Sequence, residues 1–205
     1  MNKLVIIGGG GHASVLLSLI RSHGAYEIAG IIDDGLDKGA ERHGLAVLGG
    51  EEMLPGLLAE GVTHACIGIG SISVRASLFG RLKVMGYKIP ALVHTSAVVA
   101  VGASLNEGVQ VMAGCILQPG VAVGVNTIIN TGAVIDHDCV IGAHAHIGPG
   151  AVLAGRSSVG DGSIVGAGAA LASGTRVGAG AFVGVGTSVI GDVPDGARHE
   201  RGPTG

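Results

Sequence analysis

Aromatic and charged side chains are scarce in this chain of 205 residues. It has two Tyr, two Phe and no Trp, and 13% of its residues are charged, about half of the usual share. The net charge is −3 and the basic residues are scattered, so we expect neither nucleic acid nor a membrane surface as a partner. What is abundant is glycine, with 40 residues. A hydrophobic share of 47% excludes a disordered chain, and glycine lacks the three-residue period of collagen.

Cysteine is also sparse, at Cys66, Cys115 and Cys139. Their spacing matches neither a disulfide framework nor a metal motif, which favours a reducing compartment, and we expect a cytoplasmic protein. The glycines at 8–11 interrupt the first apolar run and argue against a signal peptide. The uncharged run 108–135 is long enough to span a bilayer, but its glycines, Pro119 and polar residues argue against a membrane span.

A six-residue period runs through the second part of the chain. Every sixth residue from Val93 to Val189 is Val, Ile or Leu, and the residue four places after each, from Ala97 to Thr187, is small or short. This period predicts a hexapeptide β-helix, in which three hexads make one triangular coil and each hexad is a short strand with a tight corner. Residues 93–188 should wind about five coils. The repeat alone is also compatible with a non-catalytic scaffold.

Residues 1–90 have a different pattern. Strands are predicted at 3–7, 28–32 and 64–69, and helices at 12–22, 51–60 and 73–86. This alternation predicts a small α/β, Rossmann-like domain with a parallel sheet. We therefore expect three segments, which are an α/β domain at 1–90, an all-β helix at 91–192 and a tail at 193–205.

The turn after the first predicted strand carries a dinucleotide fingerprint. Gly8, Gly10 and Ala13 fit GxGxxA, and Asp33 follows the second predicted strand, where a ribose-binding carboxylate would lie. Glycines let a diphosphate approach the backbone, and the helix N-terminus supplies unpaired N–H groups. A glycine turn without a ligand remains an alternative. So does a small NAD(P)-binding protein, although the domain is only about half of a full dinucleotide fold.

Two of the few charges in the repeat flank a histidine, in Asp136-His137-Asp138. An imidazole can take a proton from an attacking amine or hydroxyl, and a carboxylate on its other nitrogen fixes the tautomer. The alternative is a solvated polar corner. His146 lies half a coil from His137, so the two meet only across a boundary between chains, which indicates a homo-oligomer. The same separation argues against a metal site of His137, His144 and His146, and we expect no metal.

The GGGGHA turn, the Asp33-Asp34 pair and the segment INTGAVIDHDCVIGAHAHIGPGAVLAG together resemble the nucleotide-sugar acetyltransferases related to the sialic acid O-acetyltransferases, over about residues 3–193. The resemblance implies a left-handed parallel β-helix and a homotrimer with active sites between subunits. It also implies acetyl-CoA as co-substrate and transfer to the amino group of a UDP- or GDP-linked amino-dideoxy sugar, for bacterial surface glycans or glycoproteins. The family usually closes with a segment similar to GVPAK, from which 192–201 departs.

By position, the resemblance makes His137 the general base and Asp138 the residue that raises its basicity. The nucleotide-sugar site falls on Gly10, Gly11, His12, Asp33, Asp34, Ile69 and Gly70. The acetyl-CoA site falls on His146, Ala167, Gly168 and Val185. Cys115 and Cys139 are predicted to face inward, so we expect direct transfer without an acyl-enzyme. The choice between amino and hydroxyl acceptors, and between UDP, GDP and CMP, stays open.

Overall fold

The computed structural model describes residues 1–200, so residues 201–205 of the predicted tail lie outside the described part. The chain divides into two compact units, Met1–Pro90 and a second that begins at Ala91. Within residues 1–200, no helix combines the length and apolar character needed to cross a bilayer.

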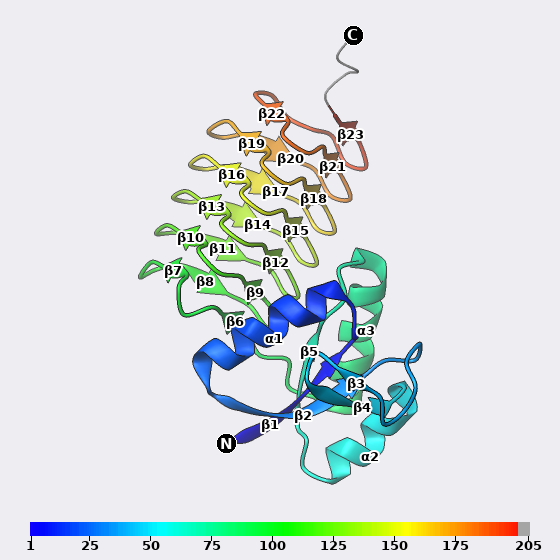
Figure 1. Ribbon diagram of the computed structural model, residues 1–205. Coiled ribbons are helices and arrows are strands. Elements are labelled where there is room, and N and C mark those ends of the chain that lie inside the picture. The colour runs from blue at the N-terminus through cyan, green and yellow to red at the C-terminus, as the bar shows by residue number, and fades with distance from the viewer. Residues whose placement is uncertain (201–205) are drawn as a thin grey trace. The chain divides into compact units, whose positions relative to one another are not determined.

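The first unit is a small α/β domain, as predicted (Figure 1). Its sheet has the order β3-β4-β2-β1-β5, in which β3 alone is antiparallel to its neighbour. The strands are β1 Asn2–Ile7, β2 Tyr26–Ile32, β3 Glu41–Arg42, β4 Leu45–Gly49 and β5 His64–Ile67. The helices are α1 Gly11–His23, the 3-10 helix η1 Glu51–Met53, α2 Leu54–Ala59 and α3 Ile72–Met85.

The order of the strands shows where a ligand of this unit should bind. The chain steps from β1 to β2 in one direction and later to β5 on the other side of β1, so the order reverses at β1. In open α/β sheets, ligands bind outside the carboxyl ends of the strands at such a reversal. The sheet is firmly packed there, because Val5, Ile7 and Ile67 lie in one buried cluster with Leu78 and Leu82 of α3.

Two local features differ from the sequence prediction. The β3–β4 hairpin was not predicted, because its two-residue turn is His43-Gly44 and not the usual Asn-Gly or Asp-Gly. Both turn residues have positive φ, at 54° and 75°. The third predicted strand ends at Ile67 and not at Ile69. Beyond it, Gly68 lies so close to α1 that a Cβ there would be 2.8 Å from the Cβ of Ala13.

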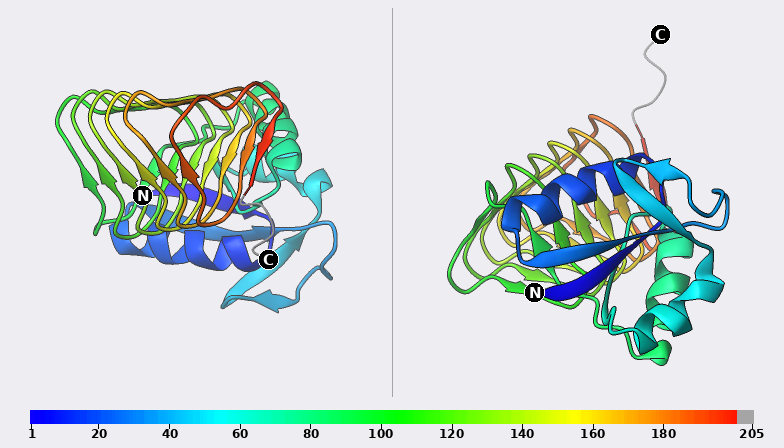
Figure 2. Two further views of the ribbon diagram at one scale, coloured as in Figure 1. Left: turned by 90° about the horizontal axis from the view of Figure 1, so that it is seen from above. Right: turned by 60° about the horizontal axis from the view of Figure 1, so that its bottom comes forward.

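The second unit is the parallel β-helix that the hexads predicted, and it has the left-handed form that the resemblance implied (Figure 1, Figure 2). Each strand pairs in parallel with the strand one coil away, as Ile116 does with Val134. Face 1 contains β7 Val98–Val99, β10 Ile116–Leu117, β13 Val134–Ile135, β16 Val152–Leu153, β19 Ala170–Leu171 and β22 Ser188–Val189. Face 2 contains β8 Ser104–Leu105, β11 Ala122–Val123, β14 Val140–Ile141, β17 Ser158–Val159 and β20 Arg176–Val177. Face 3 contains β6 Leu92–Val93, β9 Gln110–Val111, β12 Ile128–Ile129, β15 His146–Ile147, β18 Ile164–Val165, β21 Phe182–Val183 and β23 Arg198–His199.

The three edges between these faces are built from left-handed corners. Every sixth residue from Gly102 to Gly186 has a positive φ, which explains most of the glycine in the repeat. Four of these corners are not glycine, namely Asn126, Asp138, His144 and Arg156. A residue with a side chain in this conformation costs about 1–3 kcal/mol, and such strain clusters at functional sites.

The parallel ladder continues past residue 192, where the predicted β-helix segment ends. Val193 forms a bridge with Val177, and β23 pairs with β21. The Arg198 guanidinium lies 4.2 Å from the centre of the Phe182 ring. The described part of the predicted tail therefore adds a bridge to face 2 and a strand to face 3.

Candidate active site

His137 lies on the edge that joins face 1 to face 2, directly after β13. Its Nδ1 is 2.9 Å from Oδ2 of Asp138, and its backbone N–H donates to Oδ1 of Asp136 at 2.8 Å. Asp138 has φ of 58°, so the residue that contacts the imidazole is also a corner residue with a strained backbone. When Nδ1 carries the proton that Asp138 accepts, Nε2 keeps its lone pair and can act as a base. The His137 side chain is half exposed, at 49%, so a substrate can reach it.

The imidazole of His137 packs against Gly155, the matching residue one coil further along. A Cβ at Gly155 would lie 2.5 Å from Nε2 and 2.7 Å from Cε1 of His137. Gly155 has no positive φ, so its backbone does not require glycine. Only the ring of His137 requires it. Nothing in the sequence distinguished Gly155, because glycine is common throughout this repeat.

The residues predicted to bind acetyl-CoA gather on a different edge, between face 3 and face 1. His146 is the first residue of β15, and its Nε2 is 3.2 Å from Nδ2 of Asn130. Ala167 and Gly168 lie in the corner after β18, and Val185 lies in the corner after β21. Within residues 1–200 the amide N–H groups of Ala167 and Val185 make no hydrogen bond. They lie one coil apart.

His137 and His146 therefore do not come together within one chain, in agreement with the half-coil argument. His144 lies on the third edge, where its Nδ1 is 2.9 Å from Nδ2 of Asn126. No group of three or more His, Cys, Asp or Glu that suits a metal occurs in residues 1–200. The cysteines of the repeat face inward as predicted, and burial raises the pKa of the Cys115 and Cys139 thiols. Neither thiol is an available nucleophile.

The α/β unit contains a cavity of about 180 Å³ at the carboxyl ends of its strands. It is lined by Ile7, Gly8, Ile32, Asp33, Asp34, Gly35, Glu51, Ile69, Val74 and Leu78. Three of the residues predicted to bind the nucleotide sugar, Asp33, Asp34 and Ile69, are thus in its wall. The cavity lies where the reversal of strand order places a ligand.

Asp33 also holds the glycine turn. Its Oδ2 accepts from the Gly9 N–H at 2.7 Å, and its Oδ1 accepts from the Gly35 N–H at 2.9 Å. From the other side, Nε of Arg42 donates to the Gly9 carbonyl at 2.9 Å, and Nε2 of His43 is 3.0 Å from the same oxygen. Arg42 and His43 belong to the unpredicted hairpin, so sequence reasoning missed both.

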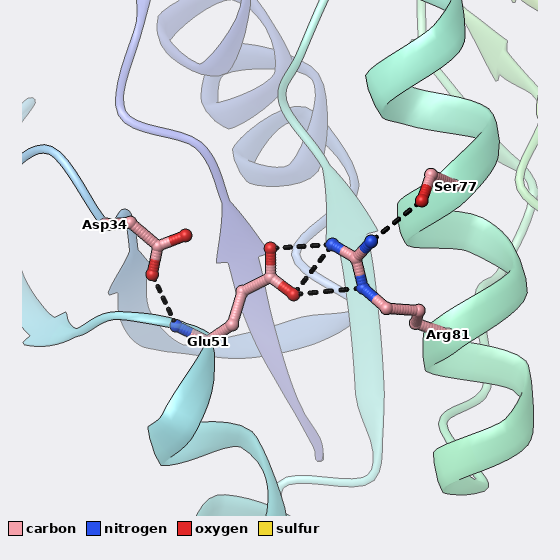
Figure 3. Close-up of polar contacts among 4 residues, drawn as sticks. All are labelled: Asp34, Glu51, Ser77 and Arg81. Carbon is pink, nitrogen blue, oxygen red and sulfur yellow. Dashed lines mark hydrogen bonds and ion pairs between the residues drawn. The ribbon is translucent and has the colours of Figure 1, made fainter.

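Asp34 and Glu51 both line the cavity, and Figure 3 shows the hydrogen bond between them. Its Oδ1 accepts from the Glu51 N–H at 2.9 Å, and the Glu51 carboxylate forms an ion pair with Arg81 at 2.8 Å. Arg81 also donates to Oγ of Ser77 at 2.7 Å. Glu51 and Arg81 were not predicted, because they are far apart in sequence and belong to no motif. Arg81 neutralises one of the three carboxylates in the cavity wall.

The remaining predicted residues surround the N-terminus of α1. A Cβ at Gly10 or Gly11 would meet nothing within 4 Å, and neither has a positive φ, so neither packing nor conformation requires glycine there. The first N–H groups of a helix have no partner within the helix, which is the arrangement that the sequence predicted for a phosphate site. His12 is half-buried in the first turn. Gly70, after β5, accepts a hydrogen bond from Arg75, whose burial lowers its pKa to about 10.

Comparisons with known proteins agree with both parts of this arrangement. The family model of the PglD N-terminal domain matches residues 3–82, and that of the bacterial transferase hexapeptide (six repeats) matches 138–173. Perosamine N-acetyltransferase from Caulobacter crescentus, in complex with CoA and GDP-perosamine, is similar over 99% of this chain and 95% of its own, with 37% identity and a TM-score of 0.94. The chain belongs to the hexapeptide-repeat nucleotide-sugar acetyltransferases.

Other relatives of this acetyltransferase family fit the same pattern. The acetyltransferase domain of PglB from Neisseria gonorrhoeae FA1090 is 33% identical over 99% of this chain and 98% of its own, with a TM-score of 0.92, and the same domain has been solved with acetyl coenzyme A. UDP-N-acetylbacillosamine N-acetyltransferase of Bacillus subtilis (strain 168) is 35% identical over 119 residues. That match spans 55% of this chain and 52% of the curated relative, about half of its length.

Proposed function

We propose that this chain is an acetyl-CoA-dependent N-acetyltransferase that acts on the amino group of a nucleotide-linked amino sugar. The observation that carries the proposal is the His137–Asp138 pair on an exposed corner of an uninterrupted hexapeptide helix. The relatives in complex with CoA, acetyl coenzyme A and GDP-perosamine support the choice of substrates. Use of acetyl-CoA fits the cytoplasmic location expected from the sequence.

The proposed chemistry is direct transfer. The amino nitrogen of the sugar attacks the carbonyl carbon of the acetyl thioester, and Nε2 of His137 takes the proton that the nitrogen loses. Asp138 holds Nδ1–H and stabilises the imidazolium. A backbone N–H stabilises the oxyanion of the tetrahedral intermediate. The C–S bond then breaks, and the imidazolium protonates the departing thiolate, which restores the base.

In this proposal His146, Ala167, Gly168 and Val185 bind acetyl-CoA. The free amides of Ala167 and Val185 suit the amide carbonyls of a pantetheine arm. The acceptor nucleotide binds in the α/β cavity, with Gly10, Gly11 and His12 at its phosphates and Asp33, Asp34, Ile69 and Gly70 around it. His137 and Asp138 stay the proposed catalytic residues.

A homotrimer would complete the transferase site. His137 lies at one border of face 1 and His146 beside the other, and the residues that point outward from this face are apolar except Ser188. Val98 is 59% exposed and Val152 is 42% exposed. Three copies with face 1 turned toward a common axis would bury these side chains. The arrangement would also place His137 of one copy beside His146 of the next.

The test of the function is acetyl transfer from acetyl-CoA to a panel of UDP-, GDP- and CMP-linked amino sugars, with thiol release as the readout. We expect transfer to an amino sugar on one nucleotide and none to the matching 4-hydroxy sugar. Acetyl-CoA at a hundred times its Kd should also increase the free energy of unfolding by about 2.7 kcal/mol, and the melting temperature should rise accordingly. Transfer to hydroxyl acceptors alone would reassign the protein as an O-acetyltransferase, and binding of NADH with no transfer would favour a nucleotide-binding protein.

Replacing Asp33 should weaken nucleotide binding. Asp33→Ala removes the acceptor for the Gly9 N–H and a carboxylate of the cavity wall, and hydrogen bonds to a charged group contribute about 1.5–3 kcal/mol. We expect at least a tenfold rise in the Kd of the preferred nucleotide among UDP, GDP and CMP, measured by calorimetry. Asp37→Ala, at an exposed carboxylate nearby, is the control. An unchanged Kd in Asp33→Ala would remove Asp33 from the site.

A further inference from the structure

Arg156 occupies the corner one coil beyond Asp138, and the proposed function does not use it. Its backbone N–H donates to the His137 carbonyl at 2.9 Å, so its main chain lies directly beside that of the proposed base. It follows Gly155, against which the imidazole packs. The Arg156 side chain therefore begins at the edge of the reacting corner.

The backbone of Arg156 is strained without a local reason. Its φ is 63°, whereas the equivalent corners at Gly102, Gly120 and Gly174 are glycine. Asp138 in the same column offsets its strain through the contact with His137. Arg156 is exposed, and its side chain has no hydrogen bond or ion pair within residues 1–200. Strain of this kind, without a compensating contact in the chain itself, points to a role toward a ligand.

Arg156 also stands out by charge. It is the only Lys or Arg between Lys88 and Arg176. The corner beside it has two carboxylates, Asp136 and Asp138, which repel an anionic substrate at short range. A guanidinium is planar, always charged and well suited to bind phosphate through two parallel hydrogen bonds. It is therefore the one cation of these coils that can offset this repulsion.

We propose that Arg156 binds the phosphoryl group attached to the sugar of the nucleotide-linked acceptor. This inference rests on the proposed function. Only the sugar ring separates the reacting amino group from that phosphoryl group, whereas the whole pantetheine arm separates the acetyl thioester from the nearest phosphate of CoA. A side chain that begins beside His137 is accordingly assigned to the acceptor and not to the coenzyme.

The test compares Arg156→Ala and Arg156→Gly with the unchanged protein. Both variants should raise the KM for the nucleotide sugar about tenfold or more, with little change in kcat or in the KM for acetyl-CoA. Arg156→Gly should also raise the melting temperature, because glycine relieves the positive φ. A residue that served only the fold would lower the melting temperature when removed. Arg176→Ala, at an exposed arginine that pairs with Asp195, is the control and should leave both KM values unchanged.

Truncated acceptors identify the group that Arg156 binds. With the amino sugar 1-phosphate, Arg156→Ala should keep its defect; with the free amino sugar, the variant and the unchanged protein should become equal. Equal KM values for the nucleotide sugar would overturn the proposal, as would a rise in the KM for acetyl-CoA alone. Calorimetry with the nucleotide sugar, in the absence of acetyl-CoA, tests the Arg156–phosphate contact separately from the proposed transferase function. If the unchanged protein transfers no acetyl group, the proposed function is rejected. The Arg156 proposal is then decided by binding alone. Weaker binding of the nucleotide sugar by Arg156→Ala supports the phosphate contact, and equal binding rejects it.

Discussion

His137→Ala should lower kcat by about 10²–10⁴-fold, the usual contribution of a positioned general base. The variant loses an imidazole that is half exposed and oriented by a carboxylate. Binding of acetyl-CoA should persist, because the proposed coenzyme residues lie on a different edge of the β-helix. The measurement is kcat for acetyl transfer together with the acetyl-CoA Kd and the oligomeric state.

The control for His137→Ala is His199→Ala, which removes an exposed histidine of β23. It should retain full activity. Added imidazole should restore part of the turnover of His137→Ala, since removal of the ring leaves space beside Gly155, and it should not affect His199→Ala. Turnover of His137→Ala near that of the unchanged protein would reject His137 as the base.

The β-helix was predictable because its physical causes repeat. A coil buries its branched residues only against the next coil, so positions such as Leu117 and Ile135 must recur every sixth residue, and the corners must recur with them. A repeat of this length would remain recognisable even if one or two positions departed from it. The GxGxxA turn was predictable for a related reason, since a strand, a turn and a helix N-terminus occur in immediate succession.

The parts that could not be predicted depend on single contacts between distant residues. His43 takes a turn position that glycine or asparagine usually occupies, so the hairpin that supports Gly9 gave no signal. Glu51 and Arg81 meet only because α3 and η1 fold toward the same cavity. Gly155 could not be recognised among the many glycines of the repeat. Most of these glycines form left-handed corners, whereas Gly155 leaves room for the side chain of His137.

Gly155→Ala should therefore disable the site without disturbing the coil. The new methyl group would lie 2.5 Å from Nε2 of His137, far inside the contact distance, whereas the backbone at Gly155 accepts any residue. The ring must move, which strains its bond to Asp138 and displaces the base from the attacking nitrogen. A displacement of about 1 Å costs about a hundredfold in rate, so we expect kcat to fall by that factor, with the KM for acetyl-CoA unchanged.

A double-mutant cycle separates this effect from general damage to the fold. In a His137→Ala background the methyl group has room, so Gly155→Ala should cause no further loss of kcat. Gly191→Ala is the matched control, because a Cβ there meets nothing within 4 Å and its φ is not positive. If Gly155→Ala lowered kcat equally with and without His137, its effect would not pass through the imidazole. The predicted loss of kcat in Gly155→Ala depends on the contact between the new methyl group and the His137 ring. The cycle therefore tests where the base lies as well as which residue it is.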